Sequence, residues 1–280
     1  LIGGFLSIMY GNNKLIMSRR SRNFYQNNRI FASKVEKILH SKISLGLANS
    51  KKVYDDLLSE GIDKNKLRLI YNGVNSEEYK PNNKLREEMR IKYQIDDNDI
   101  VLLCIANFFK YKGHSDVIDA INLNKSLINN KFKIILIGRD YGRLNSLKDK
   151  IKLYNLENNF IYMNENTDVK KIFPACDIGV LASHEEGFSN FVLEAMSSGL
   201  AMIASRVGGN EEAIKHNYSG LLFPPRNIID LSNNLVKLIN KPSLIKYLGI
   251  NGKDTVNKLF NLETTVKNYE QLYLNINKLK

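Results

Sequence analysis

The chain has 280 residues, of which 43% are hydrophobic and 25% are charged, and this composition indicates a globular protein with a substantial core. Its length is long for one domain and short for two complete domains of about 150 residues each. The two cysteines, Cys104 and Cys176, lie in apolar surroundings, so we expect no disulfide framework and a reducing, cytoplasmic compartment.

No stretch approaches the roughly 20 apolar residues that a membrane-spanning helix needs. The short apolar run 1–10 is followed rather than preceded by basic residues, so a core element fits it better than a signal peptide.

The formal net charge of +12 is unevenly distributed. Residues 1–50 contain eight basic residues but a single acidic one, Glu36, which gives this segment a net charge of +7. The basic residues are Lys14, Arg19, Arg20, Arg22, Arg29, Lys34, Lys37 and Lys42. Two interpretations stay open, namely docking on an anionic membrane surface and a solvated basic face. Nucleic-acid binding is disfavoured, because no recognised nucleic-acid motif accompanies the charge.

The first 80 residues read as an incomplete α/β unit. An apolar element at 1–10 and a basic helical stretch precede a strand at 43–50, a helix at 51–60 and a strand at 67–71. The dipeptide Asn72-Gly73 then indicates a turn, and residues 80–83 form a polar linker.

Strands and helices alternate after this linker. Helical spacing at 84–94 and a turn at 96–99 come first. Strands at 100–106, 132–137 and 160–163 then alternate with helices at 114–123 and 144–154. Such βαβ alternation predicts a parallel, doubly wound sheet. Apolar residues recur at roughly helical spacing through 253–280.

The stretch 183–199 carries the strongest functional pattern. An apolar run at 177–182 predicts a buried parallel strand, and a glycine turn then leads into an apolar helix that begins at Ser189 or Asn190 and ends at Gly199. The N-terminus of such a helix binds phosphate through unpaired N–H groups and its positive dipole end. Glu186 lies in the turn, and Glu194 lies four residues into the helix, roughly 6 Å along its axis. A diphosphate bound there would have a carboxylate on each side, although two solvated glutamates are the alternative.

This stretch resembles the glutamate-x7-glutamate signature of the group 1 (family 4) glycosyltransferases, which are retaining enzymes of the GT-B fold. The resemblance continues through 199–212, with its double glycine, and through 219–225. Upstream, Ile70–Asn75 resembles the family's interdomain signature, with Asn75 where aspartate is usual. The ordered matches extend over about two-thirds of the chain, which makes them more specific than one short motif.

The resemblance implies a fold and a domain organisation. We expect a GT-B-type α/β protein with a partial N-terminal, acceptor-side Rossmann-like domain at 1–79 and a complete Rossmann-like nucleotide-sugar domain at 80–262. A C-terminal helix at 263–280 would pack back toward the N-terminal domain. The chain opens with Leu1, and the family's glycine-rich acceptor loop and N-terminal histidine have no counterpart, so we expect an N-terminal truncation.

The resemblance also implies functional residues on two more loops. Lys112 matches the lysine that reaches the donor diphosphate, whereas Asn107 stands where the family places an arginine and supplies no charge. Lys110 could compensate for the missing charge, but a solvated lysine is favoured. Gly138 would permit close backbone approach to the donor, and Arg139 could reach phosphate or lie at the surface. Residues 163–166 occupy the position at which the family contacts the base.

The histidines suggest little. His184 could contact donor or acceptor, although packing or exposure is favoured. His114 is expected to cap a helix, and His40 and His216 are expected at the surface. No grouping has metal-ligand spacing, so we expect neither a metal nor a cofactor, and helix dipole and basic groups would stabilise the departing diphosphate.

The sequence therefore predicts a retaining, metal-independent glycosyltransferase that acts in cell-surface polysaccharide or glycolipid synthesis. It would move a hexosyl or N-acetylhexosaminyl group from a UDP- or GDP-linked donor to a saccharide or lipid-linked acceptor hydroxyl.

Glu186 and Lys112 would be catalytic, and Glu194 would hold the ribose. The remaining donor contacts would be Gly187, Phe188, Ser189, Asn190, Asn107, Gly138 and Arg139.

The expected location is cytoplasmic, with peripheral attachment to the inner face of the membrane as an option. A non-catalytic nucleotide-sugar-binding or assembly module is the alternative from another class, and a GT-B sugar-nucleotide epimerase is a weaker one.

Overall fold

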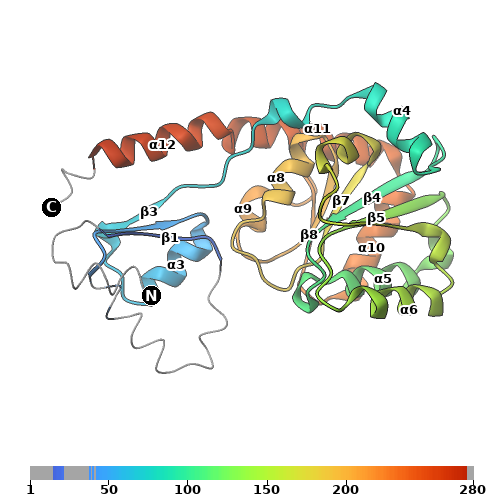
Figure 1. The fold of residues 1–280 in the computed structure, drawn as a ribbon, viewed down its shortest axis with the longest axis horizontal. Helices are drawn as coiled ribbons and strands as arrows, with labels where there is room; N and C mark the ends of the chain where they lie inside the picture. The colour runs from blue at the N-terminus through green and yellow to red at the C-terminus, as the bar shows by residue number, and fades with distance from the viewer. Residues whose placement is uncertain (1–14, 22–37, 39, 41, 276–280) are drawn as a thin grey trace.

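The computed structural model of the chain describes residues 15–21, 38, 40 and 42–275. Within them lie two parallel β-sheets, one of three strands near the N-terminus and one of six strands further along the chain (Figure 1). The element expected at 1–10 and most of the basic segment 1–50 lie outside the described residues.

The N-terminal sheet has the strand order β1-β2-β3, with β1 at Ile16–Arg19, β2 at Leu45–Ala48 and β3 at Leu67–Leu69. Each neighbouring pair is parallel. Helix α3, at Lys51–Ser59, packs on the sheet through Val53 and Leu57, which are buried with Ile43 and Leu67. The hydroxyl of Ser50 accepts a hydrogen bond from the Val53 amide at 3.1 Å, so Ser50 is the N-cap that begins this helix.

The C-terminal sheet has the order β6-β5-β4-β7-β8-β9, and all its described pairings are parallel. Its strands are β4 Ile100–Ile105, β5 Phe132–Ile137, β6 Phe160–Met163, β7 Ile178–Leu181, β8 Ala201–Ser205 and β9 Leu221–Phe223. From β4 the chain winds outward through β5 and β6, and from β7 it winds the other way through β8 and β9. The winding direction therefore reverses between β4 and β7, where doubly wound sheets open a crevice at their carboxyl edge.

Helices cover both faces of the six-stranded sheet (Figure 1). They are α4 Asn83–Lys92, α5 His114–Leu123, α6 Leu144–Leu153, α7 Val169–Ile172, α8 Asn190–Ser197, α9 Asn210–Ala213, α10 Ile228–Ile239 and α11 Pro242–Leu259. The last helix, α12 at Leu262–Asn275, lies outside this layer (Figure 1).

Alternate residues of β4 face opposite cores, as a strand requires. Leu102 packs with α5, α6 and α10, whereas Leu103 packs with α7, α8 and the end of α11.

The strands and helices predicted between 100 and 163 agree with the structure to within one residue at each end. Three expectations are wrong in detail. The stretch 253–280 is not one helical repeat, because α11 ends at Leu259 and α12 begins at Leu262. Gly113, not His114, is the N-cap of α5, and His114 is its buried first residue. His40 is buried rather than at the surface, with its imidazole 3.6 Å from the Glu60 carboxylate. His216 is exposed, as expected.

The break between α11 and α12 lies beside Val74, in the segment that connects the two sheets. The Val74 amide donates to the Phe260 carbonyl at 2.9 Å, and the Leu262 amide donates to the Val74 carbonyl at 3.1 Å. From this junction α12 runs back over the N-terminal sheet (Figure 1). The chain therefore crosses between its two parts at one point, where both crossing segments are hydrogen-bonded to each other.

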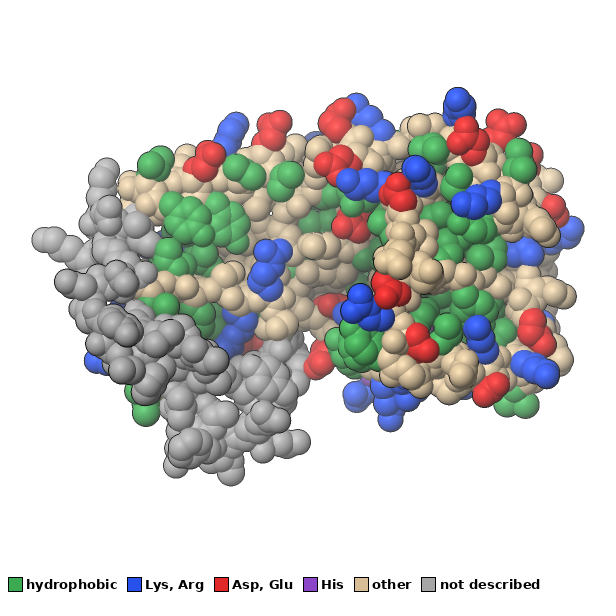
Figure 2. Space-filling model, in the orientation of Figure 1, with side chains coloured by type: hydrophobic (Ala, Val, Ile, Leu, Met, Phe, Trp, Pro, Cys, Tyr) green, Lys and Arg blue, Asp and Glu red, His purple; other side chains and the backbone are tan. Residues whose placement is uncertain are grey.

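Lys, Arg, Asp and Glu side chains are interspersed over the C-terminal part on the face that Figure 2 shows. Among the described helices, none combines the length and the apolar composition that crossing a membrane requires.

Candidate functional site

A cavity of about 530 Å³ opens at the carboxyl edge of the six-stranded sheet, at the point where the winding reverses. Residues after β4, β5 and β7 line it together with the start of α8. On this side its polar lining residues are Asn107, Lys112, Glu165, Glu186, Ser189 and Asn190. The carboxyl ends of adjacent parallel strands thus converge on one space, as the sequence predicted for these loops.

Lys112 and Glu186 meet inside this cavity. The Lys112 ammonium lies 2.7 Å from a Glu186 carboxylate oxygen, and the two side chains are 19% and 12% exposed. The main-chain amide of His184 donates to the Tyr111 carbonyl at 2.7 Å, so the loop that carries Lys112 is held against the end of β7. The ammonium has three N–H donors, of which Glu186 uses one, and the others can reach a bound anion.

The N-terminus of α8 lies beside this ion pair. Ser189 is the N-cap but makes no side-chain capping bond. The amides of Gly187, Phe188 and Ser189 have no hydrogen-bond partner among the described residues. Phe188 and Ser189, which carry two of these amides, line the same cavity as Lys112, and so does Asn190, the first residue of this eight-residue helix. The Phe188 ring packs against Tyr71 and Phe260, which anchors the turn.

Asn107 and Gly138 hold the opposite edge of the cavity. The Asn107 side-chain oxygen accepts from the Arg139 amide at 3.1 Å, which ties the loop after β4 to the loop after β5. A Cβ at Gly138 would overlap the Ala106 carbonyl oxygen, so only glycine allows this approach of the two loops. The Arg139 side chain is largely exposed, bonds Glu165 at 3.0 Å and is not part of the cavity lining.

Glu194 lies deeper along α8 and is not part of the cavity lining. Its carboxylate accepts a hydrogen bond from the Tyr79 hydroxyl. Burial raises the pKa of the Glu194 carboxyl, while the Tyr79 hydrogen bond and Lys170 act in the lowering direction. Burial and this carboxylate together raise the pKa of Tyr79. Val169, which does line the cavity, is the residue before Lys170, whose charge acts on Glu194.

His184 positions the turn and does not line the cavity. Its Nε2 lies 2.8 Å from an Asp116 carboxylate oxygen, and Arg226 donates to its Nδ1 at 3.3 Å. The imidazole thus links the end of β7 to α5 and to the loop after β9. Lys110 is exposed and is not part of the lining either.

Three lining residues come from the N-terminal part and were missed by the sequence reasoning. They are Arg20, Asn49 and Asn72. Arg20 looked like one of several basic residues, Asn49 fell inside the strand predicted at 43–50, and Asn72 looked like a turn residue. Of these three residues, Asn72 could have been identified from the sequence, because it lies inside the segment 70–75 that resembles an interdomain signature.

A carboxylate of the C-terminal part also contacts the N-terminal part. Glu212, on α9, accepts hydrogen bonds from the Lys51 amide at 2.8 and 3.0 Å and from the Lys52 amide at 3.4 Å. It therefore caps α3 from across the cleft. Tyr71 donates to the same carboxylate, and burial together with Glu212 raises the pKa of Tyr71 to about 12.

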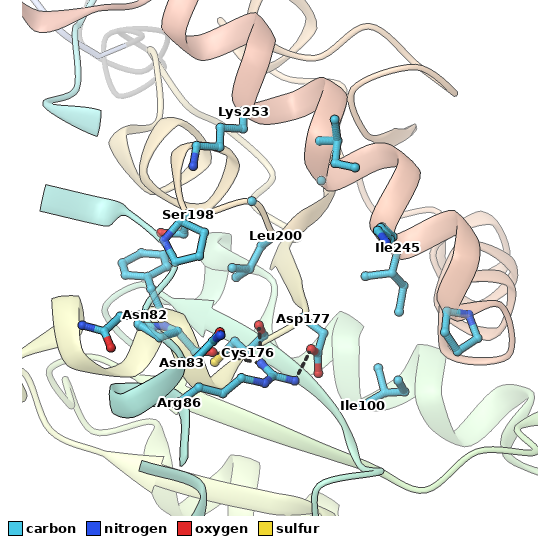
Figure 3. A pocket seen from close by; sticks show the side chains of 18 residues that line it. Asn82, Asn83, Arg86, Ile100, Cys176, Asp177, Ser198, Leu200, Ile245 and Lys253 are labelled. Carbon is cyan, nitrogen blue, oxygen red and sulfur yellow. Dashed lines mark hydrogen bonds and ion pairs between the residues drawn. The ribbon is translucent and has the colours of Figure 1, made fainter. Parts of the chain in front are cut away.

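A second cavity, of about 520 Å³, lies at the amino edge of the sheet, beside the start of β4 (Figure 3). Its walls are mostly apolar, and Arg86 crosses it to reach Asp177 at 2.8 Å. Asp177 also accepts from Arg90 at 3.0 Å and from the Val101 amide at 2.8 Å. These charged groups are already paired and fix α4 to the strand ends, so they serve the fold.

No cluster of three or more His, Cys, Asp or Glu side chains in the described part of the chain could hold a metal ion. Cys104 and Cys176 are both buried free thiols.

Comparison with known proteins identifies relatives chiefly through the part of the chain that forms the six-stranded sheet. The model of the family described as glycosyl transferases group 1 matches residues 85–255, more than half of the sequence. An uncharacterised glycosyltransferase from Methanocaldococcus jannaschii is 30% identical over 248 residues, which are 85% of this chain and 60% of that protein.

The Escherichia coli UDP-Gal:alpha-D-GlcNAc-diphosphoundecaprenol alpha-1,3-galactosyltransferase is 27% identical over 225 residues, which are 77% of this chain and 56% of that enzyme. The chain thus spans little more than half the length of these relatives.

Among solved structures, Anabaena HepE in complex with UDP and glucose superposes with a TM-score of 0.88 at 21% identity. The match covers 97% of this chain and 74% of HepE. This likeness confirms the predicted GT-B-type α/β fold with its Rossmann-like parallel sheets.

Proposed function

The chain belongs to the group 1 glycosyl transferases, and from that premise we propose that it transfers a sugar from a nucleoside-diphosphate donor to an acceptor hydroxyl. We further propose that the reaction retains the anomeric configuration and needs no metal. One observation carries the proposal. Lys112, Glu186 and the open N-terminus of α8 converge on one cavity at the winding reversal of the sheet.

These groups act on the diphosphate, which is the leaving group of the reaction. In the reaction the bond between the anomeric carbon and the diphosphate oxygen breaks, and its electron pair stays on the diphosphate. The Lys112 ammonium and the amides of Gly187, Phe188 and Ser189 stabilise that charge in a partly water-excluded cavity. The acceptor oxygen forms the new bond to the anomeric carbon, and its proton leaves with the departing diphosphate.

Glu186 orients the transferred sugar. Its carboxylate is held by Lys112 with one oxygen, and its other oxygen can accept from sugar hydroxyls. Glu194 holds the ribose at the α7 end of the cavity, where it exchanges its Tyr79 hydrogen bond for a ribose hydroxyl. Residues 163–166 border the same end through Glu165 and would meet the base.

UDP is the favoured donor nucleotide, with GDP as the alternative, and the transferred group is a hexosyl or N-acetylhexosaminyl unit. HepE, whose fold matches, was solved with UDP and glucose, and the Escherichia coli relative is named for UDP-Gal. That relative is also named for a diphosphoundecaprenol-linked acceptor. We therefore propose a saccharide or lipid-linked acceptor, synthesis of a cell-surface polysaccharide or glycolipid, and a cytoplasmic protein that attaches peripherally to the inner membrane face.

A thermal-shift panel of nucleoside-diphosphate sugars tests donor binding, and transfer of a radiolabelled sugar to lipid-linked saccharides tests catalysis. We expect Glu194→Ala to weaken nucleotide binding by about 10- to 100-fold, because a charged hydrogen-bond acceptor is lost. We expect Glu186→Gln to lower turnover by about 100-fold with little change in donor affinity. Glu185→Gln is the matched control on the same turn.

Equal activity of Glu186→Gln and the wild type would contradict the role of Glu186. Nucleotide binding by the wild-type chain without any transfer would favour the non-catalytic binding module.

A further inference from the structure

Of the described residues that line the cavity, one is an arginine without a carboxylate partner. Its charged lining residues are Arg20, Lys112, Glu165 and Glu186. Lys112 is paired with Glu186, and Glu165 is paired with Arg139. Arg20 donates to a neutral acceptor, the Asn72 side-chain oxygen, at 2.9 Å. Among the described residues it has no carboxylate partner, so its positive charge is free to meet an anion in the cavity.

The hydrogen bonds of Asn72 fix the place of this guanidinium. While its oxygen accepts from Arg20, its amide nitrogen donates to the Asn190 side-chain oxygen at 2.8 Å and to the Phe188 carbonyl at 3.3 Å. Asn190 is the first residue of α8. The guanidinium is therefore connected through Asn72 to the helix end beside the unpartnered amides.

Main-chain packing brings Arg20 to the same turn. A Cβ at Gly187 would overlap the Arg20 carbonyl oxygen, so the N-terminal segment lies directly against the turn between β7 and α8. A glycine is required here because of this close approach. The two walls of the cavity are in contact at the point where Gly187 would offer its amide to a phosphate.

Asn49 offers a second group beside Arg20. Its side-chain nitrogen donates to the Arg20 carbonyl at 3.3 Å. Its side-chain oxygen is buried and has no hydrogen-bond partner among the described residues, although Asn49 lines the cavity and is only 4% exposed. A buried, unpartnered carbonyl oxygen is costly and calls for a donor. A sugar hydroxyl in the cavity is a donor of the right kind.

We propose that Arg20 binds the donor diphosphate from across the cleft and supplies the charge that Asn107 lacks. Asn49 then accepts a hydrogen bond from a hydroxyl of the sugar attached to that diphosphate. This assignment rests on the proposed function. Asn107 supports it, because its oxygen is already used by the Arg139 amide and its side chain carries no charge. Diphosphate binding in this chain then requires both walls of the cavity together.

Calorimetric titration with UDP and with UMP tests the proposal, since the two ligands differ in the second phosphate. We expect Arg20→Gln to weaken UDP binding by about 10- to 100-fold, the size of a charge-assisted contact, and to change UMP binding less than about threefold. Arg68→Gln is the matched control, because Arg68 bonds only main-chain carbonyls of its own segment. The double variant Arg20→Gln/Asn107→Arg should recover most of the UDP affinity.

Asn49→Ala separates the second part of the proposal. It should weaken binding of UDP-glucose by about tenfold relative to UDP, because only the sugar conjugate carries the hydroxyl that Asn49 accepts. Absence of UDP and GDP binding by the wild-type chain would contradict the proposed function itself. Wild-type binding that Arg20→Gln leaves unchanged, or weakens equally for UDP and UMP, would overturn the role of Arg20 alone.

Discussion

Glu212→Ala removes the contact by which the C-terminal part caps a helix of the N-terminal part. The carboxylate accepts from the Lys51 amide at 2.8 and 3.0 Å, from the Lys52 amide at 3.4 Å and from the Tyr71 hydroxyl. The substitution leaves these donors without their acceptor. Ser50 still accepts from the Val53 amide at 3.1 Å, so α3 keeps its own N-cap. The loss therefore falls on the association of the two parts.

The magnitude follows from the groups involved. Loss of a capping oxygen costs about 0.5–2 kcal/mol, and loss of the Tyr71 hydrogen bond costs about 0.5–1.5 kcal/mol. Since Ser50 remains and water reaches the exposed amides, we expect a total of about 2 kcal/mol. An energy of this size shifts the equilibrium between associated and separated parts by about 30-fold. Glu211→Ala is the control, because Glu211 lies on the same short helix as Glu212 and pairs with exposed Arg206. Exposed pairs of this kind contribute about 0–1 kcal/mol.

Hydrogen exchange at the Lys51 and Lys52 amides measures this contact directly. In Glu212→Ala these amides should exchange about 30-fold faster than in the wild type, while core amides of β4 keep their rates. Small-angle scattering should show a larger mean radius for the same variant. If the two amides exchange equally in Glu212→Ala and Glu211→Ala, the carboxylate does not hold the two parts together.

Three further perturbations probe the fold and the site. Arg90→Ala should lower the free energy of unfolding by about 3–5 kcal/mol in urea titration, because Arg90 is 2% exposed and bonds Asp177 and the Asp96 and Asp99 carbonyls; a loss below about 1 kcal/mol would contradict this. Burial lowers the pKa of His114 in the folded protein to about 4. On acidification the unfolded chain therefore protonates this imidazole at a higher pH than the folded protein does. The contribution of neutral His114 to stability is present above pH 6.5 and is lost as the pH falls toward 4. That loss amounts to about 3 kcal/mol, and His114→Leu should show a correspondingly flatter pH profile of unfolding free energy than the wild type. Burial also raises the pKa of Glu194, so UDP affinity should decline on acidification at a higher pH than an ordinary glutamate would cause; an identical pH profile of affinity in Glu194→Gln would exclude Glu194 as the titrating group.

The sheet of the C-terminal part could be predicted because its signals are local. Apolar runs such as 100–106 and 132–137 are bounded by Asp, Asn and Gly, and helical spacing fills the intervals between them. The meeting of Lys112 and Glu186 also follows from local signals. Each lies just after a parallel strand, and adjacent parallel strands bring their carboxyl ends to one edge.

The contacts between the two parts could not be predicted in this way. Glu212 and Lys51 are 161 residues apart, and Asn72 and Asn190 are 118 residues apart, with no periodicity that relates them. Arg20 lies in a segment whose charge looks like a surface property, and only packing against Gly187 places it in the cavity. Spacing along α8 gave the axial position of Glu194 but could not reveal Tyr79, which the short helical turn Ser76–Tyr79 brings to it.

Arg20 and Glu212 both join the N-terminal part to the C-terminal part, and this makes their effects interdependent. Glu212 holds α3 to the C-terminal part, and Arg20 lies against Gly187 of that part. If both walls of the cavity bind the diphosphate, UDP stabilises the association of the N-terminal and C-terminal parts. Thermodynamic linkage then requires this association to raise the affinity for UDP by the same factor. We therefore expect saturating UDP to slow exchange of the Lys51 amide in the wild type. We expect Glu212→Ala to weaken UDP binding without touching the ligand, and Arg20→Gln to abolish the protection. Slower Lys51 exchange with UDP in Arg20→Gln would show that the nucleotide closes the cleft without this arginine.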